Sequence, residues 1–198
     1  MAELGRLQNL TSLTMSFNVI NLTFVMYKVF QQLKNLKKVE MYPPMFAECL
    51  VVALAENNPD LKVFRLFTIY PSLSDATIDV LIKSCPSLEE IILCSSQSES
   101  TIEKLSSSYP KMKRLEIRGS TGNLDEKLTK FIKKFTSLES LDVHGYKLNI
   151  TDRGIERILS SAENLKHLGI LKAPWVTNMF VERLKIKCPD LDLRINDY

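Results

Sequence analysis

The sequence predicts an α/β solenoid, in which parallel strands form the concave side and helices form the convex side. Two observations carry this prediction. A short pattern of alternating apolar residues recurs along all 198 residues, and a stretch with helical periodicity separates neighbouring copies. A single strand–helix unit cannot bury its apolar face alone, so we expect the units to stack around a shared core.

The predicted strands follow the pattern L-x-x-L-x-L, where L is leucine or another apolar residue. The first apolar residues of its copies are 24 to 27 positions apart: Leu10, Leu36, Leu61, Leu88, Met112, Leu138, Leu165 and Leu191. The second and third apolar residues of each copy lie two positions apart, which is the period of a strand with one face in the core. The pattern therefore predicts eight parallel strands.

Between the strands, apolar residues recur at the spacing i, i+3, i+4, i+7, which places them on one face of a helix. One such set is Ile78, Leu81, Ile82 and Cys85. Asn58 occupies the position that corresponds to Cys85 in the preceding unit, and we expect it to be a weak point in the packing. The spacing predicts seven helices.

Hydroxyl and proline residues mark where these helices begin and end. Ser74, Thr151 and Thr177 are suited to cap helix N-termini, because a side-chain oxygen can accept a hydrogen bond from a free backbone N–H. Prolines that stop the preceding helix occur two positions before the first apolar strand residue in four units: Pro59, Pro86, Pro110 and Pro189. The segment 119–123 lacks the Lys-Ser/Thr ending of a phosphate-binding loop and is predicted to be a turn.

Composition and charge are those of an ordinary globular chain. Hydrophobic residues make up 45% of the sequence and charged residues 25%, and the net charge of +3 is too small to imply a polyanionic partner. No apolar run approaches the roughly 18 residues of a membrane span. The N-terminus has no basic start followed by an apolar block, so we do not expect it to be a signal peptide.

The four cysteines include no C-x-x-C pair, which favours a reduced intracellular protein of the cytoplasm or nucleus. Three N-x-[ST] sequons keep a secreted protein as the alternative: Asn9, Asn21 and Asn149. Cys85 and Cys188 occupy core positions, which favours packing over a redox or metal-binding role. Cys94 should project onto the concave face, and it is the cysteine to test for thiol reactivity.

Two copies carry a family resemblance: residues 73–93 read LSDATIDVLIKSCPSLEEIIL, and residues 150–159 read ITDRGIERIL. The chain resembles leucine-rich repeat proteins of the cysteine-containing subtype, as found in the repeat region of F-box ubiquitin-ligase substrate receptors. This resemblance implies a horseshoe-shaped leucine-rich repeat solenoid that holds a protein substrate on its concave face. The alternative is a structural or adaptor leucine-rich repeat protein in another complex, unrelated to ubiquitination.

The resemblance also bears on domain organisation. Leu4 and Leu7 occupy helix positions of a repeat, and no F-box-like segment precedes them. We therefore expect residues 1–198 to be a single leucine-rich repeat domain, a fragment of a longer chain truncated at its N-terminus. A Skp-type adaptor would then bind only through a segment absent from this chain.

No constellation typical of an enzyme stands out, so we expect no catalytic, cofactor or metal site. His144 and His167 lie in neighbouring repeats but at opposite ends of their strands, roughly 13 Å apart along the strand direction. We do not expect them to share a metal ion or form a dyad. His144 is predicted to be an exposed residue of the concave face, with a general base as its minor alternative.

The concave face is the predicted partner-binding surface, because side chains that flank the strand leucines point to solvent from a rigid sheet. Its candidate residues are Tyr42, Val63, Arg65, Phe67, Ile92, Cys94, Arg114, Arg118 and His144. Five of them are expected to form a contiguous apolar patch that binds a partner or is covered by another segment: Tyr42, Val63, Phe67, Ile92 and Cys94.

Aromatic residues just past three strands predict a rim to this face: Tyr70, Tyr146 and Trp175. Trp175 is either an interface anchor or packs over the helix that begins near Thr177.

Basic residues are concentrated in the fifth unit: Lys111, Lys113, Arg114, Arg118, Lys127, Lys130, Lys133 and Lys134. The two arginines should face the concave side and the lysines from Lys127 onward the convex side, so the charge is expected to divide between two surfaces. A solvated surface, a contact for an acidic partner and a nucleic-acid groove all remain open. The divided charge makes nucleic acid the least favoured partner.

Overall fold

The structure is a computed structural model that describes residues 8–16, 23–42, 48–67, 73–93, 98–118, 122–144 and 148–196. The chain divides into two compact units, residues 1–95 and residues 96–198. Each unit alternates strands and helices in the order that the sequence predicts. Among the described residues, no helix combines the length and apolar character needed to cross a membrane.

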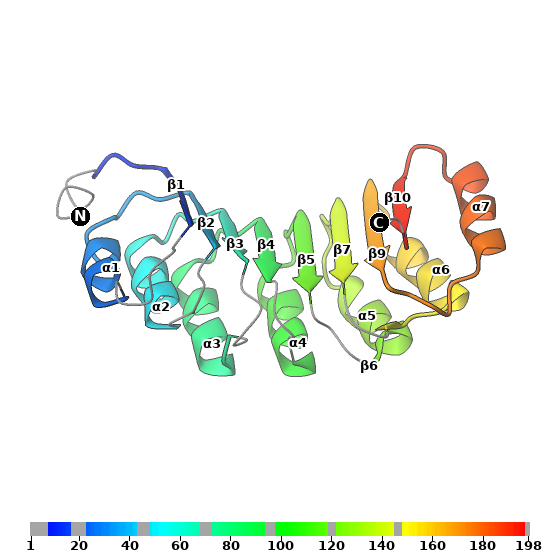
Figure 1. The fold of residues 1–198 in the computed structure, drawn as a ribbon, viewed down its shortest axis with the longest axis horizontal. Helices are drawn as coiled ribbons and strands as arrows, with labels where there is room; N and C mark the ends of the chain where they lie inside the picture. The colour runs from blue at the N-terminus through cyan, green and yellow to red at the C-terminus, as the bar shows by residue number, and fades with distance from the viewer. Residues whose placement is uncertain are drawn as a thin grey trace. The chain divides into compact units, whose positions relative to one another are not determined.

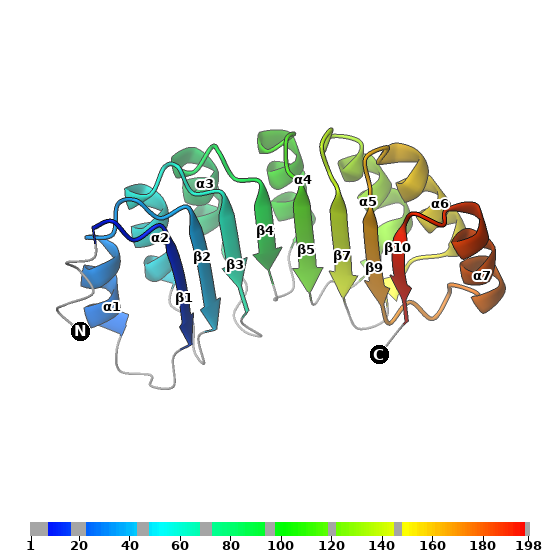
Figure 2. The same cartoon turned by 90° about the horizontal axis from the view of Figure 1, so that it is seen from above.

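The first unit contains four strands that alternate with three helices. They are β1 (Ser12–Ser16), α1 (Thr23–Phe30), β2 (Lys38–Tyr42), α2 (Glu48–Asn57), β3 (Val63–Leu66), α3 (Asp75–Ser84) and β4 (Glu90–Leu93). Neighbouring strands pair in parallel and in chain order. The three helices lie on one side of the sheet, and among the described residues of this unit no helix lies on the other side (Figures 1 and 2).

The second unit repeats this arrangement with one addition. Its elements are α4 (Glu99–Ser108), β5 (Arg114–Arg118), β6 (Gly122–Asn123), α5 (Leu124–Ile132), β7 (Ser140–His144), β8 (Leu148–Asn149), α6 (Asp152–Ser161), β9 (His167–Leu171), α7 (Asn178–Lys187) and β10 (Asp192–Ile195). Strands β5, β7, β9 and β10 form a parallel sheet in that order. The predicted strands and helices are therefore confirmed in both units.

The addition is a two-residue parallel pairing of β6 with β8. The prediction of a turn across 119–123 is wrong for its last two residues, since Gly122 and Asn123 form β6. Equivalent loops of two neighbouring repeats run side by side here, which lets their backbones pair before the helices begin.

The core of each unit lies between its sheet and its helices. One layer of strand residues is fully buried in each unit, including Val39, Phe64 and Ile91 in the first and Leu141 and Leu168 in the second. These residues are partners in the parallel register, so the predicted apolar positions stack as continuous rows. Rows of this kind are what make neighbouring repeats interdependent.

Cys85 belongs to this core, as predicted. Its thiol is fully buried, and its Sγ atom lies 3.5 Å from the carbonyl oxygens of Ala55 and Asn58. Burial raises the pKa of Cys85 to about 12, so the group remains a neutral thiol. Cys188, predicted to be equivalent, is only half-buried, and Cys49 is exposed.

Asn58 is not the weak point that the sequence predicts. It is 1% exposed. Its amide nitrogen donates to the carbonyl oxygens of Leu33 (2.9 Å) and Leu54 (2.8 Å), and its Oδ1 accepts from the backbone N–H of Leu36 (2.7 Å). A buried amide with satisfied donors and acceptor stabilises the packing instead of weakening it, and this one joins the end of α2 to the segment that follows α1.

A second set of contacts joins the beginnings of successive helices. Ser74, Thr151 and Thr177 cap α3, α6 and α7, as predicted. Each cap residue also donates its backbone N–H and its hydroxyl to a carboxylate at the start of the preceding helix. The pairs are Ser74 with Glu48 (2.7 and 2.5 Å), Thr151 with Asp125 (2.8 and 2.5 Å) and Thr177 with Asp152 (2.9 and 2.8 Å).

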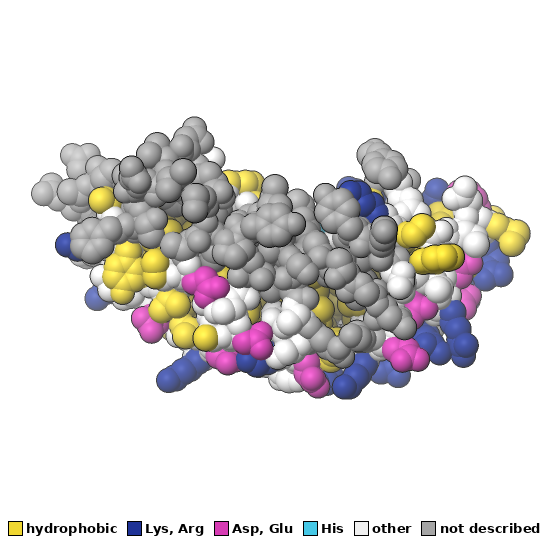
Figure 3. All heavy atoms as spheres, turned by 60° about the horizontal axis from the view of Figure 1, so that its bottom comes forward, with side chains coloured by type: hydrophobic (Ala, Val, Ile, Leu, Met, Phe, Trp, Pro, Cys, Tyr) yellow, Lys and Arg dark blue, Asp and Glu magenta, His cyan; other side chains and the backbone are white. Residues whose placement is uncertain are grey.

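We call these pairs the carboxylate bridges. Figure 3 views the molecule from the side on which the helices begin, where acidic side chains (magenta) recur. A carboxylate in the first turn of a helix also interacts favourably with the helix dipole. The bridges therefore stabilise each helix start and fix its position against the next repeat.

Candidate functional site

The candidate site lies on the sheet face that the helices leave free, called here the free sheet face. In the first unit, alternate residues of β2, β3 and β4 project from this face, while the intervening residues enter the core. The parallel register brings Glu40 beside Arg65, and Arg65 beside Ile92. Side chains that are far apart in the chain thus form rows across the sheet.

An aromatic pair marks the end of β2 and β3. The rings of Tyr42 and Phe67 are stacked with their centroids 4.5 Å apart and their planes 3° from parallel. Tyr42 is 39% exposed, which is unusual for so large a side chain in the described part of the protein. Its hydroxyl donates to Oε1 of Glu40 at 2.5 Å, so the ring is held at both its face and its tip.

An ionic row lies next to the aromatic pair. Nε of Arg65 donates to Oε1 of Glu90 (2.7 Å), and its Nη1 donates to Oε2 of Glu40 (3.2 Å). The Glu90 hydrogen bond, followed by the charges of Glu90 and Glu40, raises the pKa of Arg65 although partial burial opposes this. The Tyr42 hydrogen bond and the Arg65 charge lower the pKa of Glu40 although partial burial opposes them. Arg65 is therefore fixed between two carboxylates.

The predicted contiguous apolar patch is wrong. Val63 begins β3 and Phe67 follows its last residue, and the Arg65 row lies between them. Ile92 is only 2% exposed, because Arg65 lies beside it and reaches along β4 to Glu90. The aromatic part of the predicted patch therefore consists of the exposed Tyr42 and the half-buried Phe67. Cys94 and Tyr70 lie outside the described residues.

In the second unit, a cluster of histidines and carboxylates occupies the free sheet face. Nε2 of His167 lies 2.8 Å from Oδ1 of Asp142, and its Nδ1 lies 2.7 Å from Oδ2 of Asp192. His144 extends toward the same centre, with its Nε2 3.8 Å from Oδ1 of Asp142 and 3.7 Å from Oε1 of Glu116. We call these five residues the histidine–carboxylate cluster.

The two histidines lie at opposite ends of their strands, as the sequence predicts, yet both extend toward one carboxylate, a contact that the sequence does not predict. Asp142 lies between them, on the same strand as His144 and diagonal to His167 in the register. Gly169 is the register partner of Asp142, and a Cβ added there would lie 2.1 Å from Oδ1 of Asp142. The missing side chain of Gly169 lets the carboxylate lean across β9 to the imidazole.

A nearby cation offsets the negative charge of the buried carboxylates in this cluster. The Asp142 and Glu116 side chains are 11% and 4% exposed, and Nη2 of Arg114 lies 3.7 Å and 3.6 Å from them. Buried carboxylates require such partners. The His167 hydrogen bond, followed by that of Arg194, lowers the pKa of Asp192. Among the described residues, no group of three or more His, Cys, Asp or Glu side chains is arranged to hold a metal ion.

The remaining predicted residues are placed as follows. Arg118 ends β5, but its side chain lies outside the described residues, as does Tyr146. Trp175 is 63% exposed and donates from Nε1 to Oδ1 of Asn149 at 3.3 Å. Two of the basic residues lie on the two predicted surfaces, since Arg114 contacts the cluster on the free sheet face and Lys130 contacts Glu103 on the helix side.

No protein-family model matches the sequence, and no curated protein is significantly similar to it. Solved structures do resemble it. A protein from Bacteroides fragilis superposes with a TM-score of 0.55 at 13% identity, over 96% of this chain and 66% of its own length. A chain from the crystal structure of the Rad7 and Elc1 complex in yeast superposes with a TM-score of 0.59 at 16% identity, over 94% of this chain and 54% of its own length.

At these identities the similarity shows the fold alone. The chain spans about two-thirds of the bacterial protein and about half of the yeast protein. What it shares with them is a leucine-rich-repeat-like architecture, in which parallel strands alternate with helices packed on one side.

Proposed function

We propose that this protein is a non-catalytic recognition scaffold that binds a protein partner on the free sheet face of its first unit. The stacked pair Tyr42–Phe67 is the observation that carries this proposal. Tyrosine is over-represented among the residues that dominate protein–protein binding energy, because a large rigid ring loses little conformational entropy on binding.

The surroundings of the pair support this role. Glu40 accepts hydrogen bonds from the Tyr42 hydroxyl and from Arg65. The surface around the rings is therefore ordered before a partner binds. Preorganisation lowers the entropic cost of association. The Arg65 row satisfies its own charges, and this suits a partner that presents an apolar side chain to the rings and uncharged polar groups to the row.

A narrower role is the substrate-binding part of an F-box-type ubiquitin ligase subunit, of the cysteine-containing repeat subtype. It rests on the resemblance of residues 73–93, whose Cys85 is buried between repeats. The similarity to a chain from the Rad7 and Elc1 complex is in keeping with a fold that assembles with other proteins. In this role a Skp-type adaptor would bind a segment other than these 198 residues, and the protein would act in the cytoplasm or nucleus.

The proposal is tested by comparing captured proteins across three baits: the unchanged chain, Tyr42→Ser with Phe67→Ser, and Met179→Ser with Ile186→Ser. Met179 and Ile186 are 81% and 84% exposed on α7, so the last bait loses apolar surface elsewhere. We expect a partner that the first and third baits capture and the second does not, with unchanged circular dichroism. A partner captured equally by all three would contradict the proposed site.

The narrower role has its own readout. A Skp-type adaptor and a cullin should be captured with the full-length gene product, together with the partner that depends on Tyr42 and Phe67. Capture of that partner with neither ligase component would instead support an adaptor role in another complex.

A further inference from the structure

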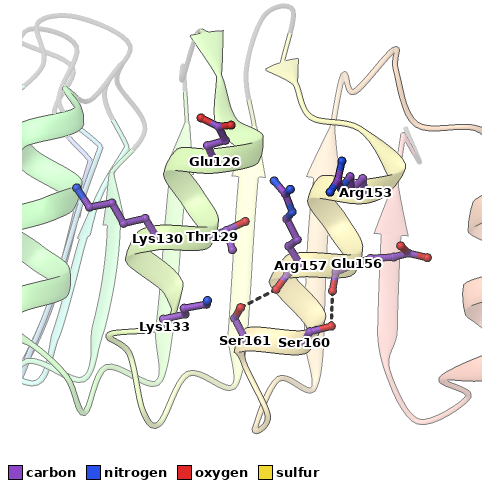
Figure 4. A pocket seen from close by; sticks show the side chains of 9 residues that line it. All are labelled: Glu126, Thr129, Lys130, Lys133, Arg153, Glu156, Arg157, Ser160 and Ser161. Carbon is purple, nitrogen blue, oxygen red and sulfur yellow. Dashed lines mark hydrogen bonds between the residues drawn. The ribbon is translucent and has the colours of Figure 1, made fainter.

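A hollow of about 780 Å³ lies on the helix side of the second unit, between α5 and α6. Figure 4 shows its lining side chains, which come from α5, from α6 and from the residue that follows α5. Four of them are cations: Lys130 of α5, Lys133 just after α5, and Arg153 and Arg157 of α6. Two are carboxylates, Glu126 and Glu156. The hollow is far from the free sheet face, because the sheet and the core separate the two surfaces.

The cations that line this hollow outnumber its carboxylates, four against two. Glu156 extends away from the hollow (Figure 4) and lies 3.3 Å from Nη2 of Arg183. Lys130 points the other way, with its Nζ 3.8 Å from Oε1 of Glu103. Within the described ranges, Lys133, Arg153 and Arg157 have no ion-pair partner. In Figure 4 the Arg157 side chain rises between the two helices, and Lys133 points toward α6.

The hydroxyl groups that line the hollow already donate hydrogen bonds within their own helices, so the cations are its remaining donors. The hydroxyls of Thr129, Ser160 and Ser161 donate to carbonyl oxygens of their own helices, at 2.6, 2.8 and 2.7 Å. The N–H groups of Lys133, Arg153 and Arg157 are the donors available to an occupant. An occupant must therefore supply acceptors, and negatively charged acceptors make the strongest hydrogen bonds with them.

From these observations we infer that the hollow binds an acidic polypeptide segment of a partner protein. Its Asp or Glu side chains would lie between Lys133 and Arg157, with Arg153 at the upper end. A polar lining does not suit an apolar small molecule, whose sites are mostly apolar. Nucleic acid is disfavoured because Glu103, Glu126 and Glu156 lie around the cations, and a continuous run of phosphates would have to cross those carboxylates.

The inference is tested with the full chain and a fluorescein-labelled peptide rich in Glu and Asp, by fluorescence anisotropy at about 0.15 M salt, where charges beyond roughly 8 Å are screened. The variant Lys133→Glu with Arg157→Glu should bind at least about tenfold more weakly, since each reversal replaces an attraction by a repulsion. The matched control is Lys185→Glu with Lys187→Glu on α7, which changes the net charge equally and should bind within about twofold of the unchanged chain.

Three results would overturn the inference. The first is that the unchanged chain binds the acidic peptide no better than a peptide with Gln and Asn in place of Glu and Asp. The second is that the α7 control loses as much affinity as the hollow variant. The third is that a single-stranded oligonucleotide of the same charge binds more tightly than the peptide. Thermal unfolding is measured for both charge-reversal variants. If the reversals perturb folding, Lys133→Gln with Arg157→Gln takes the place of the hollow variant, and its loss of affinity for the peptide should be intermediate.

Discussion

Oδ1 of Asp142 and Nε2 of His167 lie 2.8 Å apart on the free sheet face of the second unit, joined across the glycine of β9. The other ring nitrogen of His167 lies 2.7 Å from Asp192. One imidazole thus connects β7 to β10 across β9. Its partners are carboxylates on both sides, and a protonated ring can donate to both.

Replacing His167 by Gln should destabilise the second unit. Two short contacts with carboxylates are lost, one of them to the nearly buried Asp142. We expect a loss of about 2 kcal/mol in the free energy of unfolding, since hydrogen bonds to charged groups contribute about 1.5–3 kcal/mol each and the Asp192 side is exposed. Urea denaturation at neutral pH measures this.

The matched control is His144→Gln. The Nε2 atom of His144 lies 3.7 and 3.8 Å from Glu116 and Asp142, beyond hydrogen-bonding distance. Its substitution should cost less than about 1 kcal/mol. Equal losses in the free energy of unfolding for both variants would mean that the short contacts of His167 do not stabilise the unit more than the longer contacts of His144.

Gly169→Ala tests the space that the carboxylate occupies. The added Cβ would lie 2.1 Å from Oδ1 of Asp142, so the carboxylate must move away from His167. We expect a destabilisation of about 1–3 kcal/mol, as is usual for a forced fit in a packed region. In the Asp142→Asn background the same glycine substitution should still clash, whereas in Asp142→Ala it should be nearly neutral, and urea denaturation of the double variants distinguishes these cases.

The sequence predicts the elements of this fold well and the side-chain contacts poorly. Strands and helices follow from apolar periodicity, which depends on burial alone, and the caps at Ser74, Thr151 and Thr177 follow from hydroxyl chemistry. Periodicity also assigns each residue to a face. It does not say how far a long side chain leans along that face, and this decides the burial of Ile92 beneath Arg65.

The contacts in the histidine–carboxylate cluster and in the hollow could not be predicted from the sequence either, because they join residues from different repeats. Asp142 reaches His167 only because its register partner is glycine, so the register of β7 with β9 is needed to find the contact. A glycine on an outward strand position beside an acidic residue is the signal that could have indicated it. Arg153 and Arg157 join Lys133 only through the packing of α5 on α6, a full repeat later in the chain.

Asn58→Ala should be strongly destabilising. It removes an amide that is 1% exposed and leaves the N–H of Leu36 and the carbonyl of Leu33 without this partner. Leaving buried polar groups unsatisfied costs about 1–3 kcal/mol each, so we expect a loss of about 3 kcal/mol in the free energy of unfolding. Asn57→Ala is the control, because Asn57 is only half-buried and donates within its own helix to Ala53. A loss below about 1 kcal/mol for Asn58→Ala would show that the segment rearranges around the gap.

The thiols of Cys85 and Cys49 should differ sharply in reactivity. Cys85 is fully buried and its pKa is raised to about 12, so almost none of it is the reactive thiolate at neutral pH. Cys49 is exposed. Alkylation with iodoacetamide and peptide mass spectrometry should find Cys49 modified in the native protein and Cys85 modified only in urea. Early modification of native Cys85 would mean that its repeat opens readily.

Glu48→Gln should destabilise the first unit in a pH-dependent way. Partial burial opposes ionisation of Glu48, but the hydrogen bonds from Ser74 and Thr77 outweigh it, and the pKa of Glu48 is lowered from its ordinary value of 4.5. A carboxyl with a lowered pKa in the folded state contributes stability that is complete above its unfolded pKa and is lost as the pH falls through the folded pKa. The variant should therefore cost about 1–2 kcal/mol at about pH 7, as expected for a lost helix-capping interaction, and progressively less as the pH falls below the unfolded pKa.

Urea midpoints of the unchanged chain and of Glu48→Gln across this pH range measure the effect. Ser74→Ala provides a coupling test, because it removes the hydroxyl that donates to Oε2 of Glu48 and keeps the backbone N–H that donates to Oε1. In the Ser74→Ala background, Glu48→Gln should cost less than it does alone, since part of the interaction is already absent. If the two substitutions are additive, or if the cost of Glu48→Gln stays constant down to about pH 3, the carboxylate bridge does not stabilise the start of α3.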